Sequence, residues 1–137
     1  MKSNEKSIMV SGKRKTSIAK AKIVSPGSGK VIIDRIPYEK LDLMKHLLID
    51  EPIRIAKKIV KMDFDIHIST RGGGREGRIE AARLALARAI LKKTKSEHIK
   101  KAFSAYDKHL LVADIRRKEA YKPDDSKARA KRQTSYR

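Results

Sequence analysis

The stretch FDIHISTRGGGREGRIEAARLALARAILKK, residues 64–93, decides the fold class of this chain. In its first part, residues 64–70, apolar or β-branched side chains alternate strictly with polar ones, which predicts a strand. A glycine-rich turn follows, and residues 78–93 then carry apolar side chains on most sides of a predicted helix. Such a helix is usually central to a fold. We expect only one of its sectors to face solvent, the one formed by Ala81, Ala85, Arg88 and Lys92.

The segments around this stretch predict further strands and helices. Two strands, residues 7–11 and 18–24, flank a basic connection, and a return strand follows at residues 31–33. Two short helices are then expected, each with a proline near its start: one from Pro37, the other from residues 50–52. The apolar faces of these helices are formed by Leu41, Met44, Leu47 and Leu48, and by Ile53, Ala56, Ile59 and Val60.

A capping box at residues 94–97 predicts a last helix, with Ile99, Ala102, Phe103 and Tyr106 on one face. The last apolar segment covers residues 110–115. The order of strands, helices, strand and helices predicts an α+β domain of two layers, with helices packed on a mixed sheet.

The charge of the chain points to a polyanionic partner. Its 137 residues hold 35 Lys and Arg against 16 Asp and Glu, a net charge of +19. Residues 116–137 hold nine basic residues, three acids and no Val, Leu, Ile, Met or Phe. We therefore predict a globular body, residues 1–115, and an extended basic tail, residues 116–137, that stays unfolded alone. Nucleic acid is the first candidate partner.

Composition and motifs also argue against several classes of protein. Cysteine is absent, so disulfides and thiolate metal sites are excluded. We expect a soluble, cytosolic protein, because no stretch predicts a signal peptide or a membrane span. The four histidines lack the spacing of metal ligands, and no nucleophile elbow is present. We therefore expect no catalysis, cofactor, metal, membrane contact or small-molecule substrate.

The glycines at residues 72–77 literally match the dinucleotide-binding pattern G-x-G-x-x-G. That fingerprint also needs a second strand ending in an acid about 20 residues later. Glu97 lies at this distance but in a predicted helix, so an NAD or FAD site is disfavoured. Two interpretations stay open: the glycines let the backbone approach an RNA phosphate between Arg75 and Arg78, or they only make a tight turn.

The number of basic clusters exceeds what solubility requires. Aromatic residues make up only 4% of the chain, so we expect recognition of phosphates and of the shape of folded RNA rather than base stacking. The pair Lys20 and Lys22 is one such cluster. The candidate RNA-binding residues are Lys13, Arg14, Lys15, Arg71, Gly72, Gly73, Gly74, Arg75, Arg78, Arg116, Arg117, Lys118, Lys127, Arg129, Lys131 and Arg132. A nonspecific DNA-compacting protein and a nucleotide-dependent enzyme stay as alternatives.

The order and spacing of several segments resemble one family along nearly the whole chain. That family is the universal small-subunit ribosomal protein S9, and the Ser-Tyr-Arg ending resembles its archaeal and eukaryotic branch. The matching segments are residues 11–19, 26–30, 72–74, 79–91, 113–119 and 135–137.

The resemblance implies a four-stranded sheet with helices and a left-handed βαβ crossover, as in the second domain of ribosomal protein S5. It implies a place in the ribosome, in the head of the small subunit, against ribosomal RNA and neighbouring head proteins. It also implies that the tip of the tail, Ser135, Tyr136 and Arg137, contacts the anticodon stem-loop of peptidyl-site tRNA. An extended tail of 22 residues would span roughly 70 Å, enough for such a reach.

Overall fold

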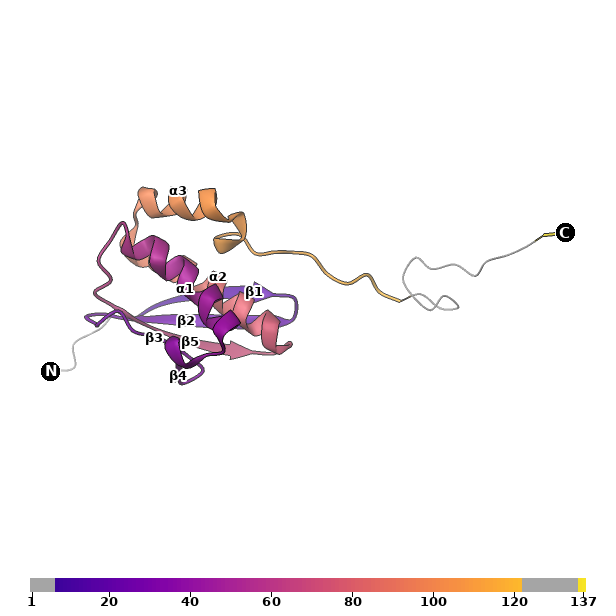
Figure 1. The fold of residues 1–137 in the computed structure, drawn as a ribbon, viewed down its shortest axis with the longest axis horizontal. Coiled ribbons are helices and arrows are strands. Elements are labelled where there is room, and N and C mark those ends of the chain that lie inside the picture. The colour runs from indigo at the N-terminus through magenta and orange to yellow at the C-terminus, as the bar shows by residue number, and fades with distance from the viewer. Residues whose placement is uncertain (1–6, 122–135) are drawn as a thin grey trace.

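A computed structural model describes residues 7–121 and 136–137 of the chain. Figure 1 shows helices lying over a sheet, with the described C-terminal segment leaving the body at one end. The elements are β1 (Ile8–Arg14), β2 (Ser17–Val24), β3 (Val31–Ile33), β4 (Ile36–Pro37), a 3₁₀ turn (Tyr38–Lys40), α1 (Leu43–Lys57), β5 (Asp65–Arg71), α2 (Arg75–Thr94), α3 (Glu97–Tyr106) and a second 3₁₀ turn (Lys108–Leu110).

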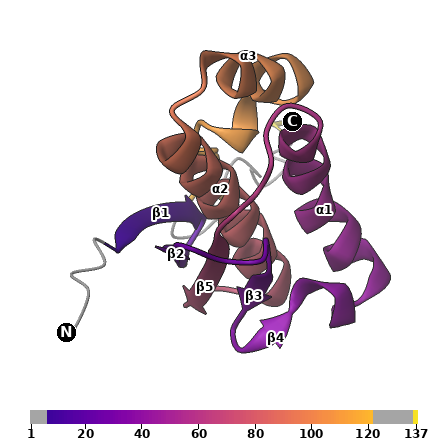
Figure 2. The same cartoon turned by 90° about the vertical axis from the view of Figure 1, so that its left-hand side faces the viewer.

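The strands form one mixed sheet in the order β1-β2-β5-β3-β4. The pair β3 and β5 is parallel, and the chain crosses between them through β4 and α1. All three α-helices lie on the same side of the sheet (Figure 2), so the predicted two-layer α+β architecture is confirmed. The left-handed sense of the crossover, implied by the family resemblance, stays a prediction.

The sheet has five strands rather than the four implied by the resemblance. The additional strand, β4, is only two residues long and pairs with β3 across the turn Asp34-Arg35. Both turn residues have positive φ values, 47° and 71°. Asp is common at the first position of such a turn, but the second position usually holds Gly and here holds Arg, so the sequence carried only half of the hairpin signal.

Strand alternation divides the sheet into a covered face and an open face. In β2, Ala19 and Ala21 are fully buried beneath the helices, whereas Lys20 and Lys22 are exposed on the opposite side. The residues of β5 alternate in the same way, with Ile66 and Ile68 covered. The predicted strand at residues 64–70 is thereby confirmed within one residue.

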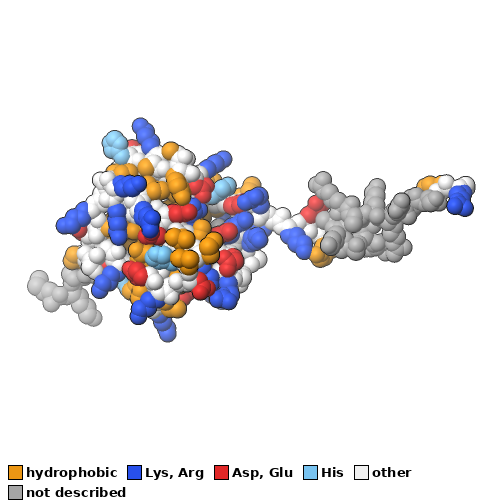
Figure 3. Space-filling model, in the orientation of Figure 1, with side chains coloured by type: hydrophobic (Ala, Val, Ile, Leu, Met, Phe, Trp, Pro, Cys, Tyr) orange, Lys and Arg blue, Asp and Glu red, His pale blue; other side chains and the backbone are white. Residues whose placement is uncertain are grey.

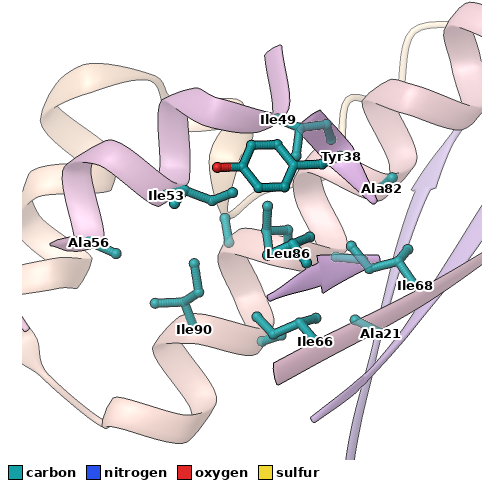
Figure 4. Close-up of a cluster of buried hydrophobic side chains, with 14 of the residues drawn as sticks. Ala21, Tyr38, Ile49, Ile53, Ala56, Ile66, Ile68, Ala82, Leu86 and Ile90 are labelled. Carbon is teal, nitrogen blue, oxygen red and sulfur yellow. The ribbon is translucent and has the colours of Figure 1, made fainter. Parts of the chain in front are cut away.

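The core lies between the covered face, α1 and α2. Figure 4 shows Ile49 and Ile53 of α1 directed toward Leu86 and Ile90 of α2, with Ile66 of β5 beneath them. All five side chains are at most 1% exposed. The burial of such large aliphatic groups supplies most of the free energy that holds the two layers together.

Helix α2 is central, as predicted, but its expected solvent-facing sector is largely buried. Ala81 and Ala85 are fully buried because β1 crosses this side of the helix. A Cβ at Gly12 of β1 would lie 2.4 Å from the carbonyl oxygen of Ala81 and 2.6 Å from the amide nitrogen of Ala85. The expected exposure of this sector was wrong. Alanine and glycine give little indication of burial in a hydrophobic pattern, but here they let the backbones of β1 and α2 come into close contact.

Two basic residues of α2 hold β1 in place. Arg88 donates hydrogen bonds to the carbonyl oxygens of Ser11 (3.0 Å) and Leu111 (2.9 Å). One turn later, Lys92 donates to the carbonyl oxygen of Met9 (3.4 Å). The basic side of α2 therefore satisfies backbone acceptors of the first strand and of the segment after α3.

The two short helices expected between residues 37 and 60 are replaced by one 3₁₀ turn and one long helix. Pro52 lies inside α1 and is buried. A proline removes one helical hydrogen bond and costs about 3 kcal/mol, which the buried residues on both sides of it offset. Part of the expected apolar face is also wrong, since Met44 is 71% exposed.

The last helix is capped by Ser96 and not by Thr94. The Ser96 hydroxyl accepts a hydrogen bond from the amide of Ile99, while the Thr94 hydroxyl donates to the carbonyl of Ile90 within α2. Lys95 adopts the left-handed conformation that ends α2. The predicted capping box was therefore placed two residues early, although Ile99 and Phe103 are buried as expected.

None of the helices in the described part of the chain combines the length and apolar character needed to cross a bilayer.

Candidate nucleic-acid interface

Two basic loops meet at one end of the sheet. The turn between β1 and β2 lies against the loop between β5 and α2, and the Ser17 hydroxyl donates a hydrogen bond to the carbonyl oxygen of Gly72 (3.2 Å). In the sheet register Arg71 lies opposite Ile18, next to this turn. We call the exposed cations brought together here the basic end: Lys13, Lys15, Arg71, Arg75 and Arg78.

The glycines of the second loop are required by its geometry. Gly72 and Gly73 have φ values of 73° and 63°, in the left-handed region. A Cβ at Gly73 would lie 2.0 Å from the Ser17 Oγ. The tight-turn interpretation is thus confirmed for these two residues. Gly74 differs, because it precedes α2 with open space around its Cα and no side chain caps the helix.

The surroundings of the loop do not match a dinucleotide site. In the part of the chain that the structure describes, β5 is the last strand, and α2 is followed by a second helix. The second parallel strand that would carry the ribose-binding acid is therefore missing from these residues. Likewise, residues 7–121 and 136–137 hold no group of three or more His, Cys, Asp or Glu side chains able to bind a metal ion.

Arg14 differs from its neighbours in the basic turn. Its side chain is only 14% exposed, and its Nε donates to a carboxylate oxygen of Glu80 on α2. Its Nη1 lies 3.3 Å from a carboxylate oxygen of Asp114. Arg14 therefore joins the turn between β1 and β2 to the helix and to the segment that leaves the body.

Asp114 connects that segment to the basic end. Besides its contact with Arg14, its carboxylate accepts hydrogen bonds from the Arg116 guanidinium (2.7 and 2.9 Å) and the Arg116 amide (2.9 Å). Those bonds from Arg116, with the nearby charge of Arg14, hold the pKa of the Asp114 carboxyl well below its usual range. The carboxylate stays ionised and fixes the root of the tail.

Beyond this root, the described residues carry exposed cations without helix or strand. Arg116, Arg117 and Lys118 are all exposed, and the Lys118 ammonium lies 4.6 Å from the ring centroid of Tyr121. At the end of the chain Arg137 is exposed and Tyr136 is 93% exposed. The remaining predicted contacts lie outside the described residues: Lys127, Arg129, Lys131, Arg132 and Ser135.

Further basic side chains lie on the open face of the sheet. Lys20 and Lys22 stand on β2, His67 on β5 and Arg35 on the turn between β3 and β4, and all four are exposed. The sequence predicted the two lysines as a cluster and His67 as a polar position of its strand, but it gave no signal for Arg35. Figure 3 shows that Lys and Arg side chains are also spread over the face of the body that it presents.

The carboxylates at the margin of the open face are hydrogen-bonded to other parts of the protein. The Asp34 carboxylate accepts hydrogen bonds from the amide (2.7 Å) and the hydroxyl of Thr70. The Asp65 carboxylate accepts from the amides of Lys30 (2.9 Å) and Ser28 (2.8 Å), and the bond from Lys30 is the main reason that the pKa of Asp65 is lowered. Hydrogen bonds within the fold, mostly from backbone amides, therefore compensate both carboxylates.

Comparison with known proteins gives one family. The description of that family is ribosomal protein S9/S16, and its sequence profile matches residues 12–137. A relative from Picrophilus torridus, named small ribosomal subunit protein uS9, is 43% identical over 128 residues, which cover 92% of this chain and 94% of that protein. The profile match begins within β1 and runs to the last residue, so it includes the basic end and the tail.

Proposed function

The chain belongs to the ribosomal protein S9/S16 family, and on this premise we propose that its basic end docks on small-subunit ribosomal RNA while its tail reaches peptidyl-site tRNA. Membership makes the chain a structural, non-enzymatic component of the small ribosomal subunit, acting in translation within the cytoplasmic ribosome. Beyond family membership, the proposal states which surface of this chain binds each RNA.

The convergence of three segments carries the proposal. The two basic loops contact each other through Ser17 and Gly72, and Arg14 ties the root of the tail to them through Asp114. The cations of the basic end and the first cations of the tail therefore share one end of the molecule (Figure 1). Such a concentration of positive charge is stable against its own repulsion when a polyanion covers it.

The chemistry of the basic end suits phosphates rather than bases. Lys13 and Lys15 offer ammonium groups without a hydrogen bond or ion pair among the described residues. Arg78 bonds the Gly72 carbonyl through its Nε, at 3.0 Å, which leaves its terminal nitrogens for an acceptor. The open space at Gly74 leaves room at the start of α2, where backbone amides favour an anion. Contacts of this kind position a protein on folded RNA.

The tail would extend this contact away from the body. From Arg116 onward 22 residues can span roughly 70 Å if extended. We propose that the protein lies in the head of the small subunit beside other head proteins, and that Ser135, Tyr136 and Arg137 meet the anticodon stem-loop of peptidyl-site tRNA. The Arg137 guanidinium would reach ahead of the terminal carboxylate and bind phosphate with its planar fork.

A salt titration with matched variants tests docking by the basic end. The full chain is titrated against small-subunit ribosomal RNA at several salt concentrations, beside Lys13→Gln/Lys15→Gln and the control Lys100→Gln/Lys101→Gln. The control removes two exposed charges from α3. We expect affinity to fall steeply with salt, and the first pair to reduce the slope by roughly 0.7–0.9 for each lost phosphate contact.

Two results would contradict the proposal. One is binding that hardly changes between low and physiological salt. The other is equal affinity for random duplex DNA at matched salt, which would favour a nonspecific nucleic-acid protein.

A further inference from the structure

A hollow of about 630 Å³ lies on the open face of the sheet, away from the helices. Its size falls within the roughly 300–1,000 Å³ of ordinary ligand sites. One row of paired residues crosses it from strand to strand: Met9 opposite Lys22, Lys22 opposite His67, and His67 opposite Ile32. Lys20, Arg35 and Ser69 also line it. The hollow is thus built by residues of four strands and one turn.

The lining combines an apolar floor with a cationic rim. Met9 and Ile32 supply the apolar surface, while Lys20, Lys22 and Arg35 supply the charge. Among the described residues, none of these three cations makes a side-chain hydrogen bond or ion pair. The acid in the lining, Asp34, is already bonded to Thr70. With three cations against one carboxylate, the hollow therefore presents a net positive charge around an apolar centre.

The backbone at Arg35 gives an independent reason to expect a ligand. Its φ of 71° follows a φ of 47° at Asp34, and the left-handed region is one that Gly or Asn occupies at lower cost. A long cationic side chain nevertheless stands at this position and lines the hollow. Local strain that stability does not explain is typical of a residue retained for function.

From these observations we infer that the hollow receives an unstacked base of the ribosomal RNA. The inference rests on the proposed function and adds a second contact, distinct from the basic end. The His67 ring and the Arg35 guanidinium are planar groups on which a base can stack. Lys20 and Lys22 reach the phosphates on either side of that base. An acidic protein segment would match the charge, but it would not use two planar groups beside an apolar floor.

Variants of Arg35 separate this function from folding. Arg35→Gly relieves the positive φ, so its thermal midpoint should equal or exceed that of the wild type. Its affinity for small-subunit ribosomal RNA should nevertheless fall roughly tenfold, because base stacking is lost. Arg35→Lys keeps the positive charge but lacks the planar guanidinium group. Its affinity for the RNA should therefore fall almost as far as that of Arg35→Gly.

Two further variants of the full chain test the phosphate contacts and the base. Lys20→Gln/Lys22→Gln should reduce the salt slope by roughly 1.4, against no comparable change in Lys100→Gln/Lys101→Gln. Ser69→Leu adds apolar bulk to the hollow without changing its charge. In the wild-type complex one base should be protected from base-specific chemical probes, and Ser69→Leu should expose it again.

The outcomes distinguish this inference from the proposed function. Wild-type affinity in Arg35→Gly and Ser69→Leu, with weakened binding in Lys13→Gln/Lys15→Gln, would overturn the hollow as a base site and leave docking by the basic end intact. Normal RNA binding by the Arg35 variants combined with a failure to join other small-subunit proteins would assign the hollow to a protein and also overturn the inference. Equal wild-type affinity for ribosomal RNA and random duplex DNA would overturn both proposals.

Discussion

The two faces of the sheet are built from the same strands but have opposite properties. On the covered face Ala19 and Ala21 are fully buried, and α2 approaches closely. On the open face the residues between and after them, Lys20 and Lys22, are exposed and make no side-chain contact with an acid among the described residues. Residues one position apart in the chain thus serve packing on one side and charge on the other.

This difference teaches that stability and RNA binding can be altered separately. Burial of apolar groups on the covered face favours folding, whereas the clustered cations of the open face oppose it slightly by repulsion. A substitution on one face should therefore change one property and spare the other. The following predictions run from the largest expected effect on the free energy of unfolding to the smallest.

Neighbouring residues of β5 give the sharpest contrast. Ile66 is fully buried, so Ile66→Ala should lower the free energy of unfolding by about 2–5 kcal/mol through lost burial and a residual cavity. His67→Ala, on the open face, should change it by less than about 0.5 kcal/mol. Urea unfolding of both variants measures the difference. Similar losses in the two variants would break the division between the faces.

A close backbone contact gives the second effect. Gly12→Ala places a methyl group 2.4 Å from the carbonyl oxygen of Ala81, and neither backbone can move aside cheaply. We expect a loss of about 1–3 kcal/mol by overpacking. Ser11→Ala, one residue earlier on the open face, is the matched control and should stay near wild type. A stable Gly12→Ala variant would mean that β1 can separate from α2 at little cost.

Acid should reveal how Asp65, a carboxylate at the margin of the open face, contributes to stability through its hydrogen bonds with backbone amides. Hydrogen bonds from the amides of Lys30 and Ser28 lower the pKa of Asp65 in the folded state. The stabilisation is therefore present above the unfolded pKa of about 3.9 and disappears as pH falls through the folded pKa. The stability difference between wild type and Asp65→Asn should shrink as pH is lowered from 7 to 2. A constant difference would exclude this linkage.

Removal of the tip of the tail should have the smallest effect on stability. Of the three deleted residues, Ser135, Tyr136 and Arg137, the structure describes the last two, and both are exposed. The unfolding curve should therefore match that of the wild type. Small subunits should still assemble, while retention of peptidyl-site tRNA should weaken because the phosphate contact is lost. Failure of assembly would instead identify the tip as an anchor on ribosomal RNA.

Much of the fold follows from alternation and spacing. The strands at residues 17–24 and 65–71 and the helix beginning near residue 75 were predictable because their apolar residues recur with period 2 or at helical spacing. The single helix through Pro52 was not predictable. The sequence shows only the local cost of a proline inside a helix, whereas the burial of Ile49, Ile53 and Ala56, which outweighs that cost, depends on the folded structure. The strand β4 was missed because its turn has Arg35 at the position that Gly usually occupies.

The candidate site was predictable as a set of charges but not as an arrangement. Runs such as Lys13 to Lys15 stand out in the sequence, yet nothing local indicates that Arg14 pairs with Glu80, 66 residues away. The role of Ser17 against Gly72 and Gly73 likewise depends on which strands become neighbours. Nothing in the sequence singled out Arg35, because what distinguishes it is its positive φ value and not its charge.

The hydrogen bonds from Arg88 and Lys92 to β1 have a consequence for the behaviour of the free chain. Strand β1 is at the edge of the sheet, and an edge strand is a template on which a second copy can add its own strand and begin to aggregate. The carbonyl oxygens of Ser11 and Met9 are taken by these two side chains and are less available to such a copy. Arg88 and Lys92, which the sequence alone presents as surface charges, thus also reduce self-association of the chain before it binds RNA.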